Sequence, residues 1–187
     1  MVIAYGLLLQ IKWNNRLIGD TGKTCKITVD GTDCPINEPQ PFSSKWFSHK
    51  FKSAGLRYEV GICIKTGSIV WAYGPFPCGS YSDLRIFRRQ LKGKLLLAGE
   101  MCEADLGYRG EPTTIRTPHD YVSRSNQHAK KKARARHETV NGLLKDWSVL
   151  TQKFRHNRSL HMQCFMAVAV LVQLTFDNGE GPWQIRY

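Results

Sequence analysis

Residues 55–76, "GLRYEVGICIKTGSIVWAYGPF", decide the fold class of this chain. In the first half of the stretch, Tyr58, Val60 and Ile62 stand at every second position and share one face of an extended strand. The letters "KTGS" that follow are typical of a tight turn, and the β-branched and aromatic residues after them favour a second strand. The stretch therefore predicts an antiparallel β-hairpin.

The segments on either side of the hairpin extend it into a mixed sheet. Residues 26–32, "KITVDGT", are β-branched and predict a third antiparallel strand, one that closes at its aspartate. After the hairpin a helix begins, with Ser82 or Asp83 as its N-cap, and residues 101–104 predict a further strand. Since a helix separates this strand from the others, we expect it to run parallel to residues 26–32.

Two more helices complete the predicted domain. Residues 126–147 predict a long basic helix, and residues 159–176 predict an almost wholly apolar, buried one. Between them and the last strand, residues 109–123 predict a loop or a short strand. The order predicts an α/β domain, a mixed five-stranded sheet flanked by helices, over residues 26–187, after a short N-terminal segment, residues 1–25.

The charge of the chain indicates a polyanionic partner. Among 187 residues, 42% are apolar, which is enough for the core of one domain. Lys and Arg outnumber Asp and Glu by 27 to 15, a formal net charge of +12. This excess of positive charge favours nucleic acid over a membrane surface as the partner. The alternative is a basic surface that is merely solvated and binds no partner.

The cysteines and the apolar segments predict an intracellular, soluble protein. The six cysteines form no C-x-x-C pair and no cluster with zinc spacing, so we expect reduced and mostly buried thiols. The N-terminus has neither a basic region nor a small-residue cleavage site, which argues against a signal peptide. The longest apolar run, residues 165–176, is too short to span a bilayer.

Three acids occupy positions that the fold can bring together. Asp30 and Asp105 each close a predicted strand just before a glycine, and parallel neighbouring strands would place both at one edge of the sheet. Glu138 follows Arg134 by four residues and precedes Lys145 by seven, so all three lie within about 40° on one stripe of the basic helix. Against this, Glu138 and Arg134 could simply form a solvated intrahelical pair, which contributes only about 0.3–0.5 kcal/mol.

Converging carboxylates predict a metal site. They repel one another and raise their own pKa values unless cations bind between them. Mg²⁺ or Mn²⁺ suits oxygen ligands, and two such ions support phosphodiester cleavage. Asp30, Asp105 and Glu138 are therefore the predicted metal ligands and catalytic residues.

Four stretches, "TVDGTDCPI", "FSHKFKSAGLRYEVGICIKTGSIVWAYGPFPCGSYSDLRIF", "EADLGYRG" and "RARHETVNGLLKDWSVL", resemble the DDE superfamily endonuclease domain of Harbinger-like transposases. The resemblance runs from about Trp13 to Tyr187. It implies a ribonuclease-H-like fold, two Mg²⁺ or Mn²⁺ ions, DNA as substrate, water or a DNA 3′-hydroxyl as nucleophile, and a nuclear location.

The resemblance also implies the roles of the acids. Asp30 matches the first catalytic aspartate, and Asp33 matches it less well because the family's acid precedes the Gly-Thr pair. Asp105 matches the second aspartate, and Glu138 matches the late glutamate of the Arg-x3-Glu-x6-Lys pattern. Asp83 matches a further family position near the catalytic strands, although a helix-capping role would account for it as well.

Basic residues around Glu138 are predicted to hold the DNA phosphates. Arg134 and Lys145 complete the family pattern, and Lys131 stands where some related transposases carry a tyrosine, so a role specific to that tyrosine does not carry over. The "KKKARAR" run suits phosphate binding or a nuclear import signal. Lys50 and its neighbours could face DNA or lie in a solvated loop.

The N-terminus departs from the family, whose members usually carry a helix-turn-helix region before the catalytic core. We therefore expect a truncated copy, a partial gene or a domesticated nuclease. The need for a separate DNA-binding accessory protein and the formation of an oligomer are left open. No membrane partner is expected. The alternative function is a non-catalytic DNA-binding relic of a transposase. A basic structural protein without any site is the third reading.

Overall fold

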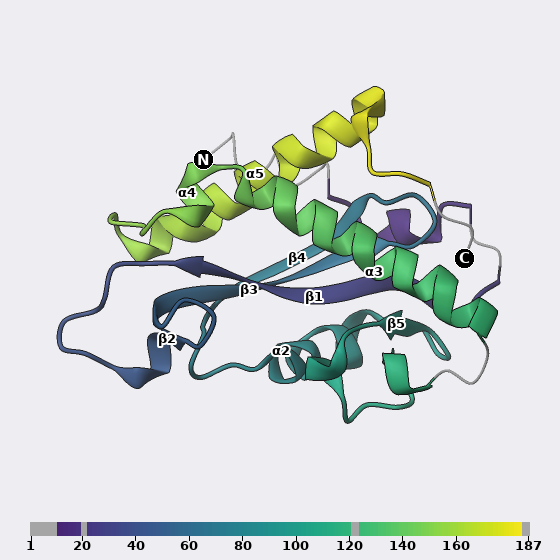
Figure 1. Cartoon of the computed structure of the whole chain (residues 1–187), viewed down its shortest axis with the longest axis horizontal. Coiled ribbons are helices and arrows are strands. Elements are labelled where there is room, and N and C mark those ends of the chain that lie inside the picture. Colours follow the sequence, from purple (N-terminus) through teal and green to yellow (C-terminus); the bar gives the residue numbers. More distant parts are fainter. Residues whose placement is uncertain (1–10, 20–21, 121–123, 185–187) are drawn as a thin grey trace.

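The computed structural model describes residues 11–19, 22–120 and 124–184. It shows an open, mixed sheet of six strands flanked by helices (Figure 1). The strands are β1 (Cys25–Pro35), β2 (Phe47–Ser48), β3 (Ser53–Cys63), β4 (Ile69–Pro77), β5 (Met101–Glu103) and β6 (Ile115–Arg116). The α-helices are α2 (Asp83–Arg89), α3 (Arg124–Lys145), α4 (Ser148–Thr151) and α5 (His161–Thr175).

The predicted hairpin is confirmed as β3 and β4, which pair antiparallel. On the other side of β3, β1 pairs antiparallel with it from Ile27↔Cys63 to Pro35↔Gly55. The prediction that this strand closes at Asp30 is wrong, because the partner strand continues to offer hydrogen bonds for five more residues. Asp30 therefore lies within β1, opposite Val60.

The predicted crossover strand is confirmed as β5, which runs parallel to β1. The sheet has one strand more than expected. The sixth strand arises because two very short segments join it: β6 pairs parallel with β5, and β2 pairs antiparallel with the start of β3. Of the two predictions for residues 109–123, a loop or a short strand, the short strand is confirmed at residues 115–116.

Helix α2 begins as the sequence suggests, at Ser82. The Ser82 side chain accepts a hydrogen bond from the backbone N–H of Arg85 and so caps the helix, while Asp83 is the first helical residue. The capping explanation for Asp83 is therefore wrong. Beyond Arg89, a π-helical turn, Leu91–Leu95, continues the helical path of the chain through Gly93.

Helices cover both faces of the sheet. In Figure 1, α3, α4 and α5 lie above the strands and α2 lies below them. The upper core joins alternate residues of β3 to these helices; among its members are Tyr58, Val60, Ile62, Val140, Leu144 and Phe165. The lower core joins the other face of β1 to α2; among its members are Ile27, Val29, Phe87 and Leu91.

Helix α3 contains a fully buried arginine, Arg136. Arg136 falls on the apolar side and donates hydrogen bonds to the carbonyl oxygens of Cys63, at 3.0 Å, of Ile64, and of Trp183, at 3.3 Å. It thus closes the end of the β3–β4 hairpin against the helix. Trp147 is 42% exposed, because α3 ends two residues before it, at Lys145.

Helix α5 is only partly buried. Phe165 and Ala169 belong to the upper core, whereas Met162 and Leu171 are 45% and 40% exposed. Together with the turns at its ends, it forms one helical segment, Arg158–Glu180, that is long and apolar enough to cross a membrane by length and composition alone. The apolar run of residues 165–176, which is too short to span a bilayer by itself, lies inside this longer segment, and a core helix of a globular protein passes the same test.

Two further sequence expectations concern the cysteines and the N-terminal segment. All six cysteines are free and five of them are buried, as expected. Residues 1–10 and 20–21 of the N-terminal segment lie outside the described residues. The described part packs on the domain, since Arg16 pairs with Glu100 at 2.7 Å and Trp13 contacts Trp71 edge to face.

Candidate functional site

The register of the parallel strands brings Asp30 and Asp105 to the same level of the sheet. The pairing of β1 with β5 ends at Thr28↔Glu103, and each aspartate lies two residues farther along the chain, Asp30 within β1 and Asp105 just past the end of β5. Since β5 ends at Glu103, the edge of β1 on that side has no strand partner at Asp30 among the described residues. Asp105 caps the short 3₁₀ turn Leu106–Tyr108, and its Oδ1 accepts a hydrogen bond from Gly107 N at 2.8 Å.

Helix α3 adds Glu138 and Arg134 to the same place. A pocket of about 100 Å³ lies between β1, the end of β5 and α3. It is lined by Thr28, Val29, Asp30, Glu103, Ala104, Asp105, Arg134, His137 and Glu138. The three predicted acids and one predicted phosphate-binding cation therefore border a single pocket.

The other predicted cations lie outside this pocket. Arg134 is half-buried and Glu138 is exposed, and the ion pairs among the described residues do not include one between them. The intrahelical pair is thus not formed. Lys131 is exposed one turn before Arg134, and Lys145 lies two turns beyond Glu138, where its charge acts on the Cys34 thiol of β1.

Asp30 is held from two sides. Its Oδ1 accepts a hydrogen bond from Gly31 N at 2.7 Å, and its Oδ2 accepts one from Asn141 Nδ2, on α3, at 3.1 Å. Burial raises the pKa of Asp30 from 3.8 to about 6, and the charges of Asp105 and Asp83 add to this rise. Lys50 and the Gly31 N–H oppose it.

Asp83 reaches the cluster from α2 because Gly31 has no side chain. A Cβ at Gly31 would lie 2.0 Å from Asp83 Oδ1, so this close approach requires glycine. Asp83 Oδ2 and Asp105 Oδ1 both lie within 3.4 Å of the point that a Cβ of Gly107 would occupy, which places the two carboxylates beside each other. Burial raises the pKa of Asp83, against the nearby charge of Arg57, whose Nη1 is 3.4 Å away.

Asp33, in contrast, has a structural role. It is fully buried and receives Arg57 Nε at 2.6 Å, Arg57 Nη2 at 3.0 Å and the Ser48 hydroxyl at 2.7 Å. Burial alone would raise the pKa of Asp33, but these donors outweigh it and hold the pKa below its ordinary value. Such a paired carboxylate holds β1, β2 and β3 together.

Lys50 is a site residue that the sequence left undecided. It lies in the turn between β2 and β3, where its backbone N–H donates to Ser48 Oγ at 3.3 Å. Its Nζ donates to the carbonyl oxygen of Gly31 at 3.2 Å, and its charge acts on Asp30 and Asp83. A lysine in a polar turn carries no local signal that distinguishes this role from ordinary solvation.

His137 and Lys130 line or support the pocket from α3. The Thr28 hydroxyl and His137 Nδ1 are 2.7 Å apart, and His137 Nε2 is buried with no hydrogen-bond partner in the part of the chain described. Burial, and then the charge of Arg136, lowers the pKa of His137 to about 3, so the ring is neutral at pH 7. Lys130 Nζ lies 3.2 Å from Glu103 Oε1 and balances that buried acid.

The donor chemistry of the cluster suits a hard divalent cation. Carboxylate oxygens are the ligands that Mg²⁺ and Mn²⁺ take, and a cation would offset the repulsion by Asp105 and Asp83, which adds to the effect of burial on the pKa of Asp30. Across residues 11–19, 22–120 and 124–184, however, no group of three or more His, Cys, Asp or Glu side chains is arranged to hold a metal ion.

Comparison of the chain with known protein families, with curated proteins and with solved structures found no match.

Proposed function

We propose that this protein is a divalent-metal-dependent DNA endonuclease and strand transferase of the DDE transposase type, with a ribonuclease-H-like fold. The observation that carries the proposal is the common level of Asp30 and Asp105, two residues past the last paired residues of parallel β1 and β5. Arg134 and Glu138 line the same pocket. The resemblance to Harbinger-like transposases assigns the same three acids, and the formal charge of +12 suits DNA.

In this proposal, Asp30, Asp105 and Glu138 hold Mg²⁺ or Mn²⁺, with Asp83 as a further oxygen donor. Such ions would polarise the phosphodiester and orient it for in-line displacement. Water or a DNA 3′-hydroxyl attacks the phosphorus and gives up its proton to solvent, the bond to the leaving 3′-oxygen breaks, and that oxygen takes up a proton.

The protein's own residues position these groups. Asn141 and Gly31 N fix the orientation of the Asp30 carboxylate. Arg134 lies where it can bind a phosphate beside the acids, and Lys50, bound to the Gly31 carbonyl oxygen, supplies positive charge close to Asp30.

The second candidate is a DNA-binding relic without turnover. It is favoured by the exposure of Glu138 and by the lack of a formed three-ligand group among the described side chains. A nuclear location and a separate DNA-binding accessory protein stay predictions in either case.

The test compares the purified protein with Asp105→Asn on supercoiled plasmid DNA. With Mg²⁺ or Mn²⁺, we expect the wild-type protein to nick the plasmid and the variant to lose at least about 100-fold in rate, whereas Ca²⁺ should support binding without efficient cleavage. Unchanged cleavage by Asp105→Asn would contradict the assignment. Wild-type protein that binds the plasmid but does not cleave it with either ion would support the relic.

A second measurement does not depend on activity. Mg²⁺ should raise the melting temperature of the wild-type protein, because a ligand that binds only the folded state stabilises it. Asp105→Asn should respond less. Equal responses would place the ion elsewhere.

A further inference from the structure

The segment after α4 lies beside the far end of β1, away from the acids. Phe154 forms a single parallel β-bridge with Ile36, just past the end of the strand. Phe154 N donates to Pro35 O at 3.0 Å, and Asn37 N donates to Phe154 O at 3.1 Å. These bonds fix the backbone of the segment against the sheet.

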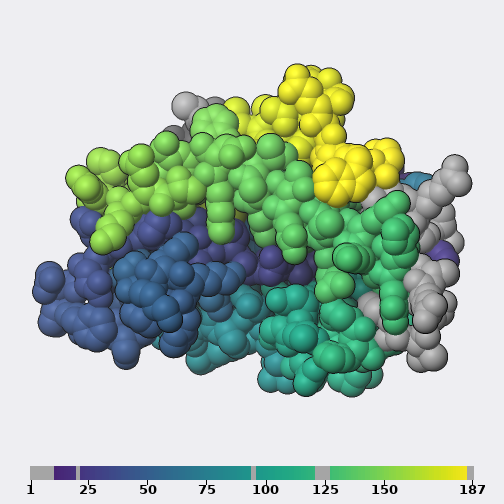
Figure 2. All heavy atoms as spheres, viewed as in Figure 1, coloured from purple at the N-terminus to yellow at the C-terminus, as the bar shows by residue number. Residues whose placement is uncertain are grey.

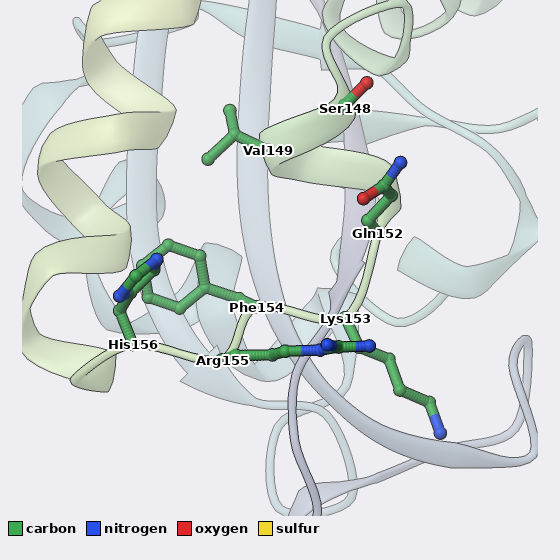
Figure 3. A pocket seen from close by; sticks show the side chains of 7 residues that line it. All are labelled: Ser148, Val149, Gln152, Lys153, Phe154, Arg155 and His156. Carbon is green, nitrogen blue, oxygen red and sulfur yellow. The ribbon is translucent and has the colours of Figure 1, made fainter.

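The bridge sets the direction of the side chains on both sides of Phe154. Because side chains alternate along an extended backbone, Lys153 and Arg155 point opposite to Phe154. Phe154 is buried, and its ring packs edge-on against His161 at 4.8 Å between centroids. Figure 3 shows the Lys153 and Arg155 side chains extending together, away from the rings of Phe154 and His156.

The two cations border a pocket that contains no acid. The pocket has a volume of about 330 Å³, and its lining includes Lys153, Arg155 and His156 but neither Asp nor Glu (Figure 3). Both cations are exposed, and no ion pair with another described residue involves either of them. Two cationic side chains that extend from a fixed backbone and form no ion pair within the protein are suited to bind an anion.

The pocket is aligned with the candidate active site. Ile36 follows Asp30 by six positions of extended chain, which corresponds to about 20 Å. Helix α3 follows β1 over the first part of this distance, from Asn141 at Asp30 to Lys145, a rise of about 6 Å, and α4 then leads to the pocket. In Figure 2, the green and yellow-green surface of α3, α4 and the next segment borders the blue and purple strands along this face.

We propose that Lys153 and Arg155 form a second binding site for DNA backbone phosphates, which holds the duplex about six base pairs from the point where the acids act. A duplex rises about 3.4 Å per base pair, so about 20 Å matches about six base pairs. The inference rests on the proposed function in one respect: it takes the DNA to run along β1 and α3. It adds a site that extends the contact beyond the acids.

The test uses the double variant Lys153→Ala/Arg155→Ala of the full chain and measures binding of a labelled duplex of about 24 base pairs in Ca²⁺ over a range of salt concentrations. Each lost phosphate contact should lower the salt slope by about 0.9, so the variant should lose about two units and at least about tenfold in affinity at low salt. The matched control is Lys23→Ala/Lys65→Ala, which removes two exposed charges near the opposite end of β1 and should leave the slope unchanged. Equal losses in both double variants would overturn the site, since net charge would then explain them.

Duplex length gives the second readout. Wild-type affinity should rise sharply once the duplex exceeds about six base pairs, and the double variant should lose this rise. A wild-type series without such a step would overturn the alignment of the two sites. Vesicles with anionic lipid form a further arm: if the variant loses vesicle binding but keeps DNA binding, the pocket binds a membrane surface and the proposal is wrong.

The outcome is separable from that of the proposed function. The pocket variant is measured by binding in Ca²⁺, whereas the proposed function fails if Asp105→Asn cleaves as fast as wild type. A loss of binding in the pocket variant would therefore support the second site even in a protein that cleaves nothing.

Discussion

Asn141 donates its side-chain amide to Oδ2 of Asp30 at 3.1 Å, although 111 positions separate the two residues in the sequence. Through this bond α3 is joined to β1 at the acid that is the first predicted metal ligand. The other oxygen of Asp30 is taken by the N–H of Gly31. Helix position and carboxylate orientation are therefore linked at the candidate site.

Asn141→Ala should weaken the site more than it weakens the fold. The change removes one donor to a carboxylate, which costs about 1–3 kcal/mol of stability. We expect metal-dependent cleavage to fall by at least about tenfold in kcat with little change in DNA affinity, because Asn141 orients Asp30 and does not bind DNA. Kinetics and DNA-binding titrations of the purified variant check this. A loss confined to DNA affinity would contradict the positioning role.

Asp30→Asn should make the protein more stable at neutral pH. The pKa of Asp30 is about 6 in the folded protein and 3.8 ordinarily, so between these values the folded state keeps a proton that the unfolded chain has lost. The contribution of Asp30 to stability therefore falls as pH rises through this window. The variant avoids this loss and should gain up to about 3 kcal/mol above pH 6, with no gain below about pH 4. Urea denaturation of both proteins across pH measures the difference, and a variant that is less stable at pH 7.5 would refute the shift.

Lys50→Met should raise the pKa of Asp30 above about 6, because the lysine charge is the largest influence that opposes the effect of burial. Titration of the Asp30 carboxyl carbon by NMR gives the value directly. The matched control is Lys52→Met, in the same turn. If both variants shift Asp30 equally, the contact of Lys50 with Gly31 does not define the electrostatics of the site.

Arg136→Leu should destabilise the fold by about 2–4 kcal/mol, because its buried hydrogen bonds to the carbonyl oxygens of Cys63 and Ile64 would be lost. The control is Arg134→Leu. Arg134 lies two residues earlier on the same helix and is only half-buried, so its replacement should change stability by less than about 0.5 kcal/mol. Thermal or chemical denaturation compares them. Similar losses in the two variants would count against the structural role of Arg136.

Arg134→Ala and Lys145→Ala should each lower the salt dependence of DNA binding by about one unit, and equally on two unrelated duplexes, since phosphate contacts carry no base information. Lys131→Ala serves as a third position on the same helix. Affinity measured against salt concentration decides the matter. Wild-type slopes on both duplexes would exclude phosphate contact, and a loss on one duplex alone would indicate sequence recognition.

Much of the architecture could be predicted because its causes are local. Alternation at Tyr58, Val60 and Ile62 predicts which face of β3 is buried, and the helical spacing of Val140 and Leu144 predicts the buried side of α3. The crossover rule then predicts the parallel direction of β5. The strands β2 and β6 were harder to predict, because each has only two residues, which are too few to show the alternation of a strand. Each forms only because a neighbouring strand, β3 or β5, is there to pair with it.

The sequence by itself determined the strand and helix order, the basic charge and the three candidate acids. Only the tertiary structure decided which side chains surround them: Asp83 approaches over Gly31, Lys50 reaches the Gly31 carbonyl, and Asn141 binds Asp30. It also decided that Asp33 forms an ion pair with Arg57. The physical reason is that a strand or helix is specified by neighbours along the chain, whereas these contacts join residues from separate elements. Their geometry follows from how those elements pack, and no short pattern records it.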